Sequence, residues 1–265
     1  MAVPLSLEGK RALVTGGSRG IGAETVRLFV EAGARVAFNY RAAREQAESL
    51  AAQCGGPGRS IAIQHDLGSP ADGRELVRKA VAALGGLDIL VANHGIWEPR
   101  DAPIDAMSEA QWRQTLAVNL DAVFGLVQQA VGHFLESHGP GPESRRAPHH
   151  IVLISSTAGQ RGEACHADYA VTKGAIISLT KSLSTELAPK RIMVNCVAPG
   201  WVETGMSAAT LADPVLGPKI GAGIPVGRVA TPREIAGPVL FLCTPLAGFI
   251  SGEILNVNGG AVLVG

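Results

Sequence analysis

The chain is poor in cysteine and aromatic residues, and it carries no excess of charge. Its 265 residues include four cysteines, and aromatic residues make up 4% of the sequence. The cysteines are scattered without a C-x-x-C pair, which argues against a disulfide framework or a metal site and indicates reduced thiols: Cys54, Cys165, Cys196 and Cys243. Lys and Arg number 23, as do Asp and Glu, so the formal net charge is zero. Nucleic acid and anionic membranes are therefore not expected as main partners.

Long apolar runs and export signals are also missing. No run of about 18 apolar residues is present that could form a transmembrane helix. The opening residues, MAVPLSLEGKRALVTG, lack a basic segment followed by an apolar one, so no secretion signal is indicated. These features predict a cytoplasmic protein. Glycine, in contrast, is abundant at 33 residues, which suits tight turns and close packing of helices on a sheet.

Short apolar runs alternate with helical patterns along the whole chain. Strands are predicted at residues 11–15, 35–38, 60–64, 87–92, 151–154, 192–198 and 253–257. Helices are predicted at residues 21–32, 42–53, 70–84, 108–136 and 232–243 and around Tyr169, with a solvent loop at 137–150. This order predicts an α/β fold with a doubly wound parallel sheet and helices on both faces. No linker or repeat interrupts it, so residues 1–265 are expected to form a single domain.

A glycine-rich loop lies between the first predicted strand and the first predicted helix. Glycine lets a backbone approach a phosphate closely, and the helix start supplies unpaired N–H groups and a partial positive charge. A glycine cluster alone is also compatible with a simple tight turn, but its place between strand and helix predicts a dinucleotide site. The candidate cofactor contacts in this loop are Gly16, Ser18, Arg19, Gly20, Ile21 and Gly22.

The end of the second predicted strand indicates which dinucleotide is expected. An NAD site usually presents Asp or Glu there to the ribose hydroxyls. This chain has Tyr40 and Arg41 instead, and the glycine loop adds Arg19. Guanidinium groups bind phosphate through paired N–H donors, so the sequence favours NADP(H) over NAD(H). The alternative is that Arg41 is a solvated residue at a helix start.

Residues 151–173 carry the candidate chemistry. An apolar strand ends at Ser155 and Ser156, and Tyr169 and Lys173 follow at a spacing that places them on one face of a helix. A nearby ammonium is expected to lower the pKa of the phenol from about 10. The phenol can then exchange a proton with a carbonyl or alcohol oxygen that a serine also contacts. The spacing alone is common by chance, so the interpretation depends on the other motifs.

Together these motifs resemble the short-chain dehydrogenase/reductase family. Residues 15–22 match its T-G-x-x-x-G-x-G loop, and residues 93–95 (NHG) fall where the family usually has N-A-G. Ser156 with Tyr169 and Lys173 matches its serine and its Y-x-x-x-K motif, and Asn119 matches its helix asparagine. Residues 199–200 (PG), with Thr204 beyond them, and 256–260 (NVNGG) match two further segments. The resemblance covers nearly the whole chain and implies a seven-stranded Rossmann sheet and usually a homotetramer.

The resemblance also implies roles for individual residues. Tyr169 would be the acid/base, Lys173 would lower its pKa and bind the nicotinamide ribose, Ser156 would orient the substrate oxygen and Asn119 would hold a water. Further cofactor contacts are implied at Ser155, Asp66, Leu67, Asn93, Gly95, Pro199, Gly200, Val202 and Thr204. His94 departs from the family pattern, and a packed, hydrogen-bonded imidazole is expected there rather than a catalytic one.

Within the family, residues 226–228 and 232–236 resemble those of carrier-protein ketoacyl reductases and NADPH carbonyl reductases. The expected reaction is reduction of a 3-oxoacyl thioester or related carbonyl compound. The alternatives are an NAD(P)-dependent secondary alcohol, sugar or steroid dehydrogenase and, in another class, a non-catalytic dinucleotide sensor. Lys190–Arg191 and Arg145–Arg146 either bind an acidic carrier protein or are ordinary solvated charges. Residues 203–226 are expected to form a mobile lid, with Trp201 and Met206 facing the substrate.

Overall fold

The computed structural model describes residues 5–137 and 148–264. In these ranges a seven-stranded parallel sheet has the order β3-β2-β1-β4-β5-β6-β7. This is the predicted α/β arrangement, and its strand order reverses between β1 and β4. The strands are β1 (Arg11–Val14), β2 (Arg35–Tyr40), β3 (Ser60–Gln64), β4 (Ile89–Ala92), β5 (His149–Ile154), β6 (Ile192–Pro199) and β7 (Ile254–Val257).

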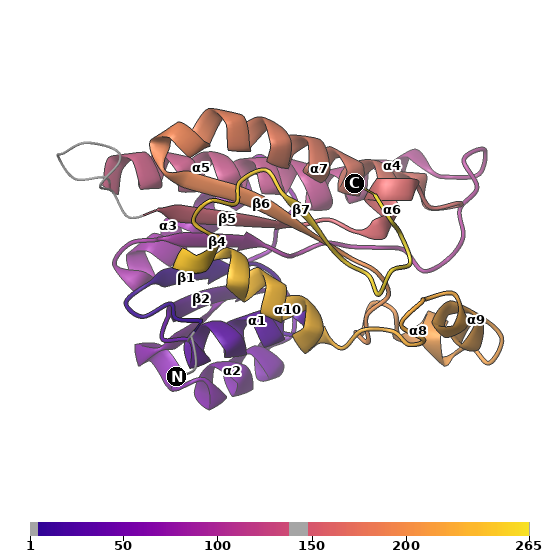
Figure 1. Cartoon of the computed structure of the whole chain (residues 1–265), viewed down its shortest axis with the longest axis horizontal. Helices are drawn as coiled ribbons and strands as arrows, with labels where there is room; N and C mark the ends of the chain where they lie inside the picture. Colours follow the sequence, from indigo (N-terminus) through magenta and orange to yellow (C-terminus); the bar gives the residue numbers. More distant parts are fainter. Residues whose placement is uncertain (1–4, 138–147, 265) are drawn as a thin grey trace.

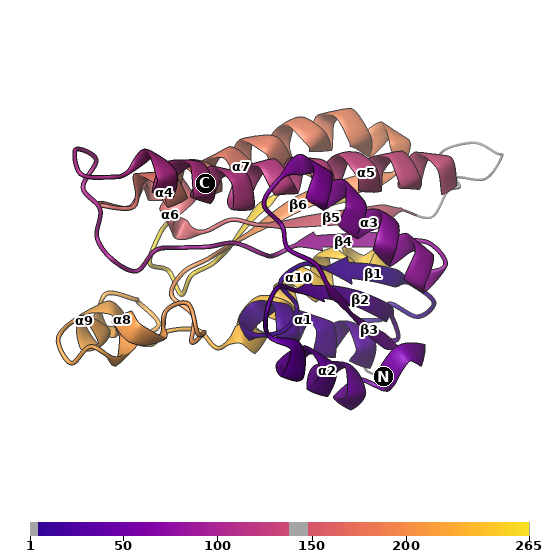
Figure 2. The same cartoon turned by 180° about the vertical axis from the view of Figure 1, so that it is seen from behind.

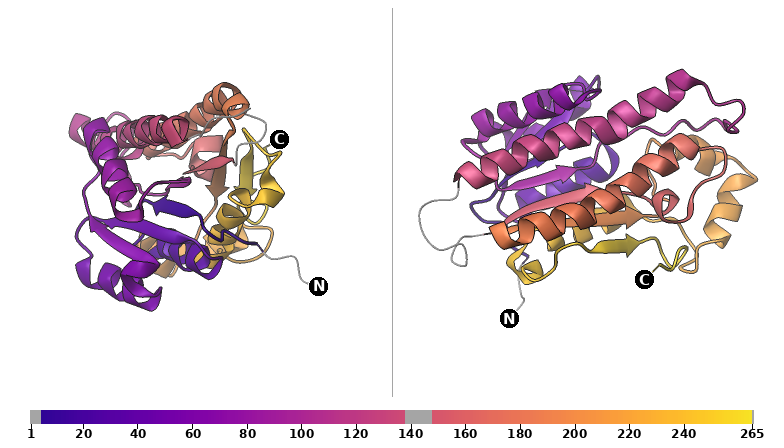
Figure 3. Two further views of the ribbon diagram at one scale, coloured as in Figure 1. Left: turned by 90° about the vertical axis from the view of Figure 1, so that its left-hand side faces the viewer. Right: turned by 90° about the horizontal axis from the view of Figure 1, so that it is seen from above.

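Helices cover both faces of the sheet, as Figures 1 and 2 show. One layer contains α3 (Pro70–Leu84), α4 (Glu109–Leu116), α5 (Ala122–Ser137) and α7 (Ala167–Leu187), and the other contains α1 (Gly20–Glu31), α2 (Arg44–Gln53) and α10 (Pro232–Leu242). The end-on view in Figure 3 shows the sheet between the two layers. The short helices α8 (Ala208–Ala212) and α9 (Leu216–Ala222) project from one end. Among the described residues, no helix is long and apolar enough to cross a membrane.

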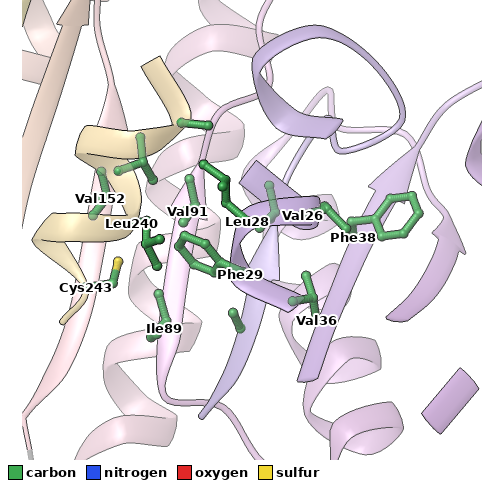
Figure 4. Close-up of a cluster of buried hydrophobic side chains, with 14 of the residues drawn as sticks. Val26, Leu28, Phe29, Val36, Phe38, Ile89, Val91, Val152, Leu240 and Cys243 are labelled. Carbon is green, nitrogen blue, oxygen red and sulfur yellow. The ribbon is translucent and has the colours of Figure 1, made fainter. Parts of the chain in front are cut away.

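Two apolar clusters hold the layers to the sheet. Figure 4 shows one of them, in which Phe29 of α1 and Leu240 of α10 pack against Val91 and Val152 of the central strands. The second cluster lies on the opposite face and includes Leu76, Leu126 and Ile176 from α3, α5 and α7. Strands β4 and β5 are therefore buried on both faces, which explains why their sequences are continuous apolar runs rather than alternating ones.

The long helical pattern predicted at residues 108–136 is interrupted by one wide turn. Ser108 begins α4 by accepting a hydrogen bond from the N–H of Gln111 at 3.1 Å. The π turn η2 (Ala117–Asp121) then separates α4 from α5. A single π turn inside a helix is rare, and where one occurs it is often at a functional site. Asn119 lies in this one. The residue types at 117–121 give no signal that would have predicted it.

The beginning of β5 corrects the sequence-based expectation for residues 137–150. His149 and His150 were expected in a solvent loop, but they form the first two positions of β5 and are buried. His149 stacks on Phe134 with a centroid separation of 4.4 Å, and the backbone of His150 pairs with β4 and β6. Pairing with neighbouring strands and packing against a distant aromatic ring therefore override the polar character of the two histidines. Arg145 and Arg146 lie outside the described residues.

Helix α7 is fixed to α4 at its first turn, next to Tyr169. The buried carboxylate of Asp168 accepts hydrogen bonds from Thr115 Oγ1 at 2.7 Å and from Gln111 Nε2 at 3.2 Å. Both donors come from α4, which precedes the π turn. The contact therefore fixes the start of α7 relative to the segment that carries Asn119.

Candidate functional site

A cavity of about 640 Å³ lies where the strands end at their carboxyl edge. Segments that follow β1 to β6 line it, as expected where the order of a doubly wound sheet reverses. Almost all residues predicted for the site line it: Gly16, Ser18, Arg19, Gly20, Ile21, Tyr40, Arg41, Asp66, Leu67, Asn93, Gly95, Ser155, Ser156, Tyr169, Lys173, Pro199, Gly200, Val202 and Thr204. Gly22 and Asn119 do not line the cavity and lie behind its wall.

The glycine loop has the shape that a pyrophosphate group requires. Gly16 and Gly20 adopt positive φ angles of 64° and 55°. A Cβ on Gly22 would lie 2.2 Å from the carbonyl oxygen of Gly16, so only glycine allows α1 to close on the loop. Among the residues that the structure describes, no side chain caps the amino end of α1. Its first N–H groups are therefore available to a phosphate in the cavity, and the loop fits a dinucleotide.

Asn39 holds this loop in place and was missed by the sequence analysis. Its Oδ1 accepts a hydrogen bond from the N–H of Gly16 at 2.8 Å, and its Nδ2 donates to the carbonyl of His65 at 2.9 Å. One side chain thus connects the segments after β1 and β3. Its polar side chain, near the end of an otherwise apolar strand, was the feature of the sequence that could have indicated this role.

Arg19 and Arg41 are exposed and lie at the cavity wall. Within residues 5–137 and 148–264, neither guanidinium forms a hydrogen bond or an ion pair. Tyr40 is 5% exposed, so its ring belongs largely to the core. The carboxylate in this region is Asp66, after β3, whose Oδ1 accepts a hydrogen bond from the N–H of Leu67 at 2.9 Å. Because the guanidiniums of Arg19 and Arg41 have no partner among the described residues, their positive charge is available near the end of β2.

Ser156, Tyr169 and Lys173 come together at the inner part of the cavity. Ser156 starts the short helix α6 (Thr157–Arg161) by accepting a hydrogen bond from Ala158, and it lies close enough to Tyr169 to act on the pKa of the phenol. Lys173 Nζ donates to the carbonyl of Ile154 at 2.8 Å and lies 5.6 Å from the centre of the Tyr169 ring. Ser155 Oγ donates to the carbonyl of Lys173 at 2.7 Å, which binds α7 to the end of β5.

The pKa of Tyr169 changes in the direction opposite to the one predicted from sequence. Burial raises the pKa of Tyr169 to about 12; the hydrogen bond with Ser156 acts to lower it, and the charge of Glu163 raises it further. Burial also lowers the pKa of Lys173 to about 8. The prediction that Lys173 lowers the pKa of Tyr169 is therefore wrong for this structure. The ammonium is held by Ile154 near the ring face, and loss of water determines the direction in which the pKa of Tyr169 changes.

His94 occupies the place of the small residue of N-A-G as a packed, hydrogen-bonded imidazole. Its Nε2 lies 2.9 Å from the carbonyl of Val118, which can only accept, so Nε2 carries the proton. Its Nδ1 then accepts from Thr15 Oγ1 at 2.9 Å. Burial, with a smaller effect of the Lys173 charge, lowers the pKa of His94 to about 4, so the ring is neutral near pH 7. His94 thus connects the end of β1 to the π turn.

Asn119 is buried within the π turn, and both the oxygen and the nitrogen of its side chain form hydrogen bonds. Its Oδ1 accepts from the N–H of Ile96 at 2.8 Å, and its Nδ2 donates to the carbonyl of Ile96 at 2.9 Å. A Cβ on Gly95 would lie 3.3 Å from Asn119 Oδ1 and 3.5 Å from Lys173 Nζ. Asn119 therefore shapes the loop after β4 and lies next to Lys173.

The other side of the cavity is aromatic. Trp201 and Met206 line it, as the sequence analysis expected. Trp97, which the sequence analysis did not identify, also lines it and meets Trp201 edge-on at 6.1 Å between centroids. Lys190 and Arg191, in contrast, immediately precede β6 and so lie at the opposite edge of the sheet from the cavity.

Known proteins are similar to this chain in sequence and in fold. Residues 16–262 match the protein-family model described as Enoyl-(Acyl carrier protein) reductase. The chain is 36% identical over 261 residues to a 3-oxoacyl-[acyl-carrier-protein] reductase of Vibrio cholerae, covering 98% of this chain and 100% of the relative.

Two solved structures are similar over nearly their whole length. One is a 3-ketoacyl-(acyl-carrier-protein) reductase from Brucella melitensis complexed with NADH, with a TM-score of 0.87 and 31% identity over 97% of this chain and 100% of that chain. The other is a short chain dehydrogenase from Burkholderia cenocepacia in complex with NADP, with a TM-score of 0.84 and 34% identity over 96% of this chain and 98% of that chain.

Proposed function

We propose a function from the premise that this chain belongs to the short-chain dehydrogenase/reductase family. The chain is an oxidoreductase that reduces a ketone to a secondary alcohol with NADP(H), and its substrate is a 3-oxoacyl thioester or a related carbonyl compound. One observation carries the proposal: Ser156, Tyr169 and Lys173 line the same cavity as a glycine loop that fits a dinucleotide.

Each residue of the group has a distinct task. NADPH, when bound, would supply the hydride that reaches the carbonyl carbon. Ser156 donates a hydrogen bond to the substrate oxygen as negative charge grows there, and Tyr169 gives that oxygen its proton. With its raised pKa the phenol of Tyr169 is protonated near pH 7, so it has a proton to give in the reductive direction. Lys173 would hold the ribose, and Asn119 would hold the loop and a water beside it.

Free positive charge supports the preference for NADPH. Arg19 and Arg41 present two guanidiniums at the cavity wall, and a 2′-phosphate carries the negative charge that they match. An NAD-specific site would offer a carboxylate at the end of β2, where this chain has Tyr40 and Arg41. The two solved relatives contain different dinucleotides, so the arginines carry this part of the proposal.

The experiment is a kinetic comparison of NADPH and NADH on a ketone panel that includes a 3-oxobutanoyl thioester. Wild type is expected to prefer NADPH, and Arg41→Asp is expected to lose that preference. Arg44→Asp is the matched control, because Arg44 starts α2 and contacts Glu48 and Gln64 instead of lining the cavity. Preference for NADH in wild type would contradict the cofactor assignment, and no turnover of any ketone would contradict the enzyme assignment.

The proposal extends to partners and assembly. An acyl carrier protein is a candidate carrier of the substrate. Lys190 and Arg191 lie at the opposite edge of the sheet, so they are unsuited to contact it at the cavity.

A homotetramer is supported by exposed apolar side chains in one helical layer, Phe124 on α5 and Val171 on α7, which are 50% and 48% exposed. Residues 203–226, which contain α8 and α9, act as the lid of a single domain. The four free cysteines fit a cytoplasmic location.

A further inference from the structure

Glu163 is a cavity residue for which the proposed chemistry has no task. It lies in the loop between α6 and α7 and lines the same cavity as Ser156 and Tyr169. The carboxylate is half-buried, and burial raises its pKa above the ordinary value, against the lowering effects of His166, Arg161 and a hydrogen bond from Trp97. Its charge in turn raises the pKa of Tyr169, so the carboxylate lies close enough to the phenol to interact with it.

A rigid aromatic scaffold holds this carboxylate. The ring of His166 stacks on Trp97 with a centroid separation of 4.9 Å and an interplanar angle of 18°. His166 is itself fixed, with Nε2 at 2.9 Å from the carbonyl of Glu98 and Nδ1 at 3.1 Å from that of Ala164. Trp97 lowers the pKa of Glu163, so the two side chains lie close together. Glu163 thus lies beside packed aromatic groups that come from two loops.

The carboxylate has acceptor capacity left for a substrate. An ionised carboxylate offers about four lone-pair sites, of which the neighbouring Trp97 N–H can occupy at most one. A substrate hydroxyl in the cavity can therefore donate a charge-assisted hydrogen bond to Glu163, which is stronger than a bond between neutral groups. A substrate carboxylate at the same place would be repelled by the like charge of Glu163. Trp97 and Trp201 provide apolar walls for the carbon skeleton.

We propose that Glu163 determines substrate specificity by selecting neutral carbonyl compounds that carry a hydroxyl group close to the reacting ketone and by rejecting compounds with a carboxylate there. This inference rests on the proposed carbonyl reductase function and narrows its substrate class. Glu163 acts through contact with the substrate and takes no part in proton transfer.

The test uses three matched compounds with NADPH: ethyl 3-oxobutanoate, ethyl 4-hydroxy-3-oxobutanoate and the monoethyl ester of 3-oxopentanedioate, whose free carboxylate lies on the same side of the ketone as the hydroxyl. For wild type, kcat/KM is expected to rise at least about tenfold when the hydroxyl is added and to fall at least about tenfold when a carboxylate is placed on that side of the ketone instead. In Glu163→Gln both ratios should move toward one, mainly through KM. Removal of the Glu163 charge should also shift the alkaline limb of the kcat profile to lower pH, because that charge raises the pKa of Tyr169.

Glu98→Gln is the matched control, because this carboxylate lies in the neighbouring loop and does not line the cavity. It should keep the wild-type ratios. An enzyme that reduces ethyl 3-oxobutanoate but shows ratios near one, unchanged in Glu163→Gln, overturns the inference and leaves the proposed function standing. An enzyme that reduces none of the three compounds with either dinucleotide overturns the proposed function, and the inference falls with it.

Discussion

The buried ammonium of Lys173 should make the stability of this protein depend on pH in a specific window. Lys173 is 5% exposed, and burial lowers its pKa from 10.5 to about 8. Between these two values the unfolded chain binds more protons than the folded chain, so the free energy of unfolding rises with pH. A pKa difference of about 2.5 corresponds to about 3 kcal/mol over the whole window. About 2 kcal/mol of this should appear between pH 7 and pH 10.

Lys173→Met removes the titrating group while keeping much of the side-chain volume. Urea unfolding of wild type and variant at several pH values from 7 to 10 gives the two free energies of unfolding. Wild type is expected to gain about 2 kcal/mol relative to the variant across this range. Cys196 and Tyr169 also have raised pKa values and are present in both proteins; the charge of Lys173 affects the pKa of Cys196 less than burial does, so the comparison reports mainly on Lys173.

Lys181→Met serves as the control, because Lys181 lies on the same helix and is exposed. Its free energy of unfolding should follow that of wild type at every pH. A difference between wild type and Lys173→Met that stays constant from pH 7 to pH 10 would refute the reasoning, since it would mean that the ammonium is not desolvated in the folded protein.

Three further predictions concern the site and the assembly. Tyr169→Phe should lower kcat at least about a hundredfold with little change in NADPH affinity, measured by turnover and by fluorescence titration, and near-normal turnover would remove Tyr169 from its role. His94→Ala should lower the free energy of unfolding by about 2–4 kcal/mol in urea, because the carbonyl of Val118 and the hydroxyl of Thr15 lose a partner and a cavity remains; an unchanged free energy would contradict the contacts. Light scattering should give four times the mass of the chain, whereas a monomer at micromolar concentration would contradict the tetramer.

Local sequence patterns were sufficient to predict the sheet and most of the residues that line the cavity. Each strand of a parallel sheet ends at the same edge, so the segments that follow β1, β2, β4 and β5 had to converge. The positive φ angles of Gly16 and Gly20 and the capping role of Ser156 likewise follow from residue type at fixed spacing. These features depend on short stretches of chain, so they can be predicted from the sequence alone.

By itself, then, the sequence determined the order of the elements, the glycine loop and the group formed by Ser156, Tyr169 and Lys173. Only the tertiary structure decided the direction of the pKa change of Tyr169, because desolvation depends on what packs around the ring. It also decided the burial of His149 and His150, the bridge from Thr15 through His94 to the π turn, and the support that Trp97 gives to Glu163. Each of these joins segments far apart in the chain, and no local pattern specifies which distant side chains will meet.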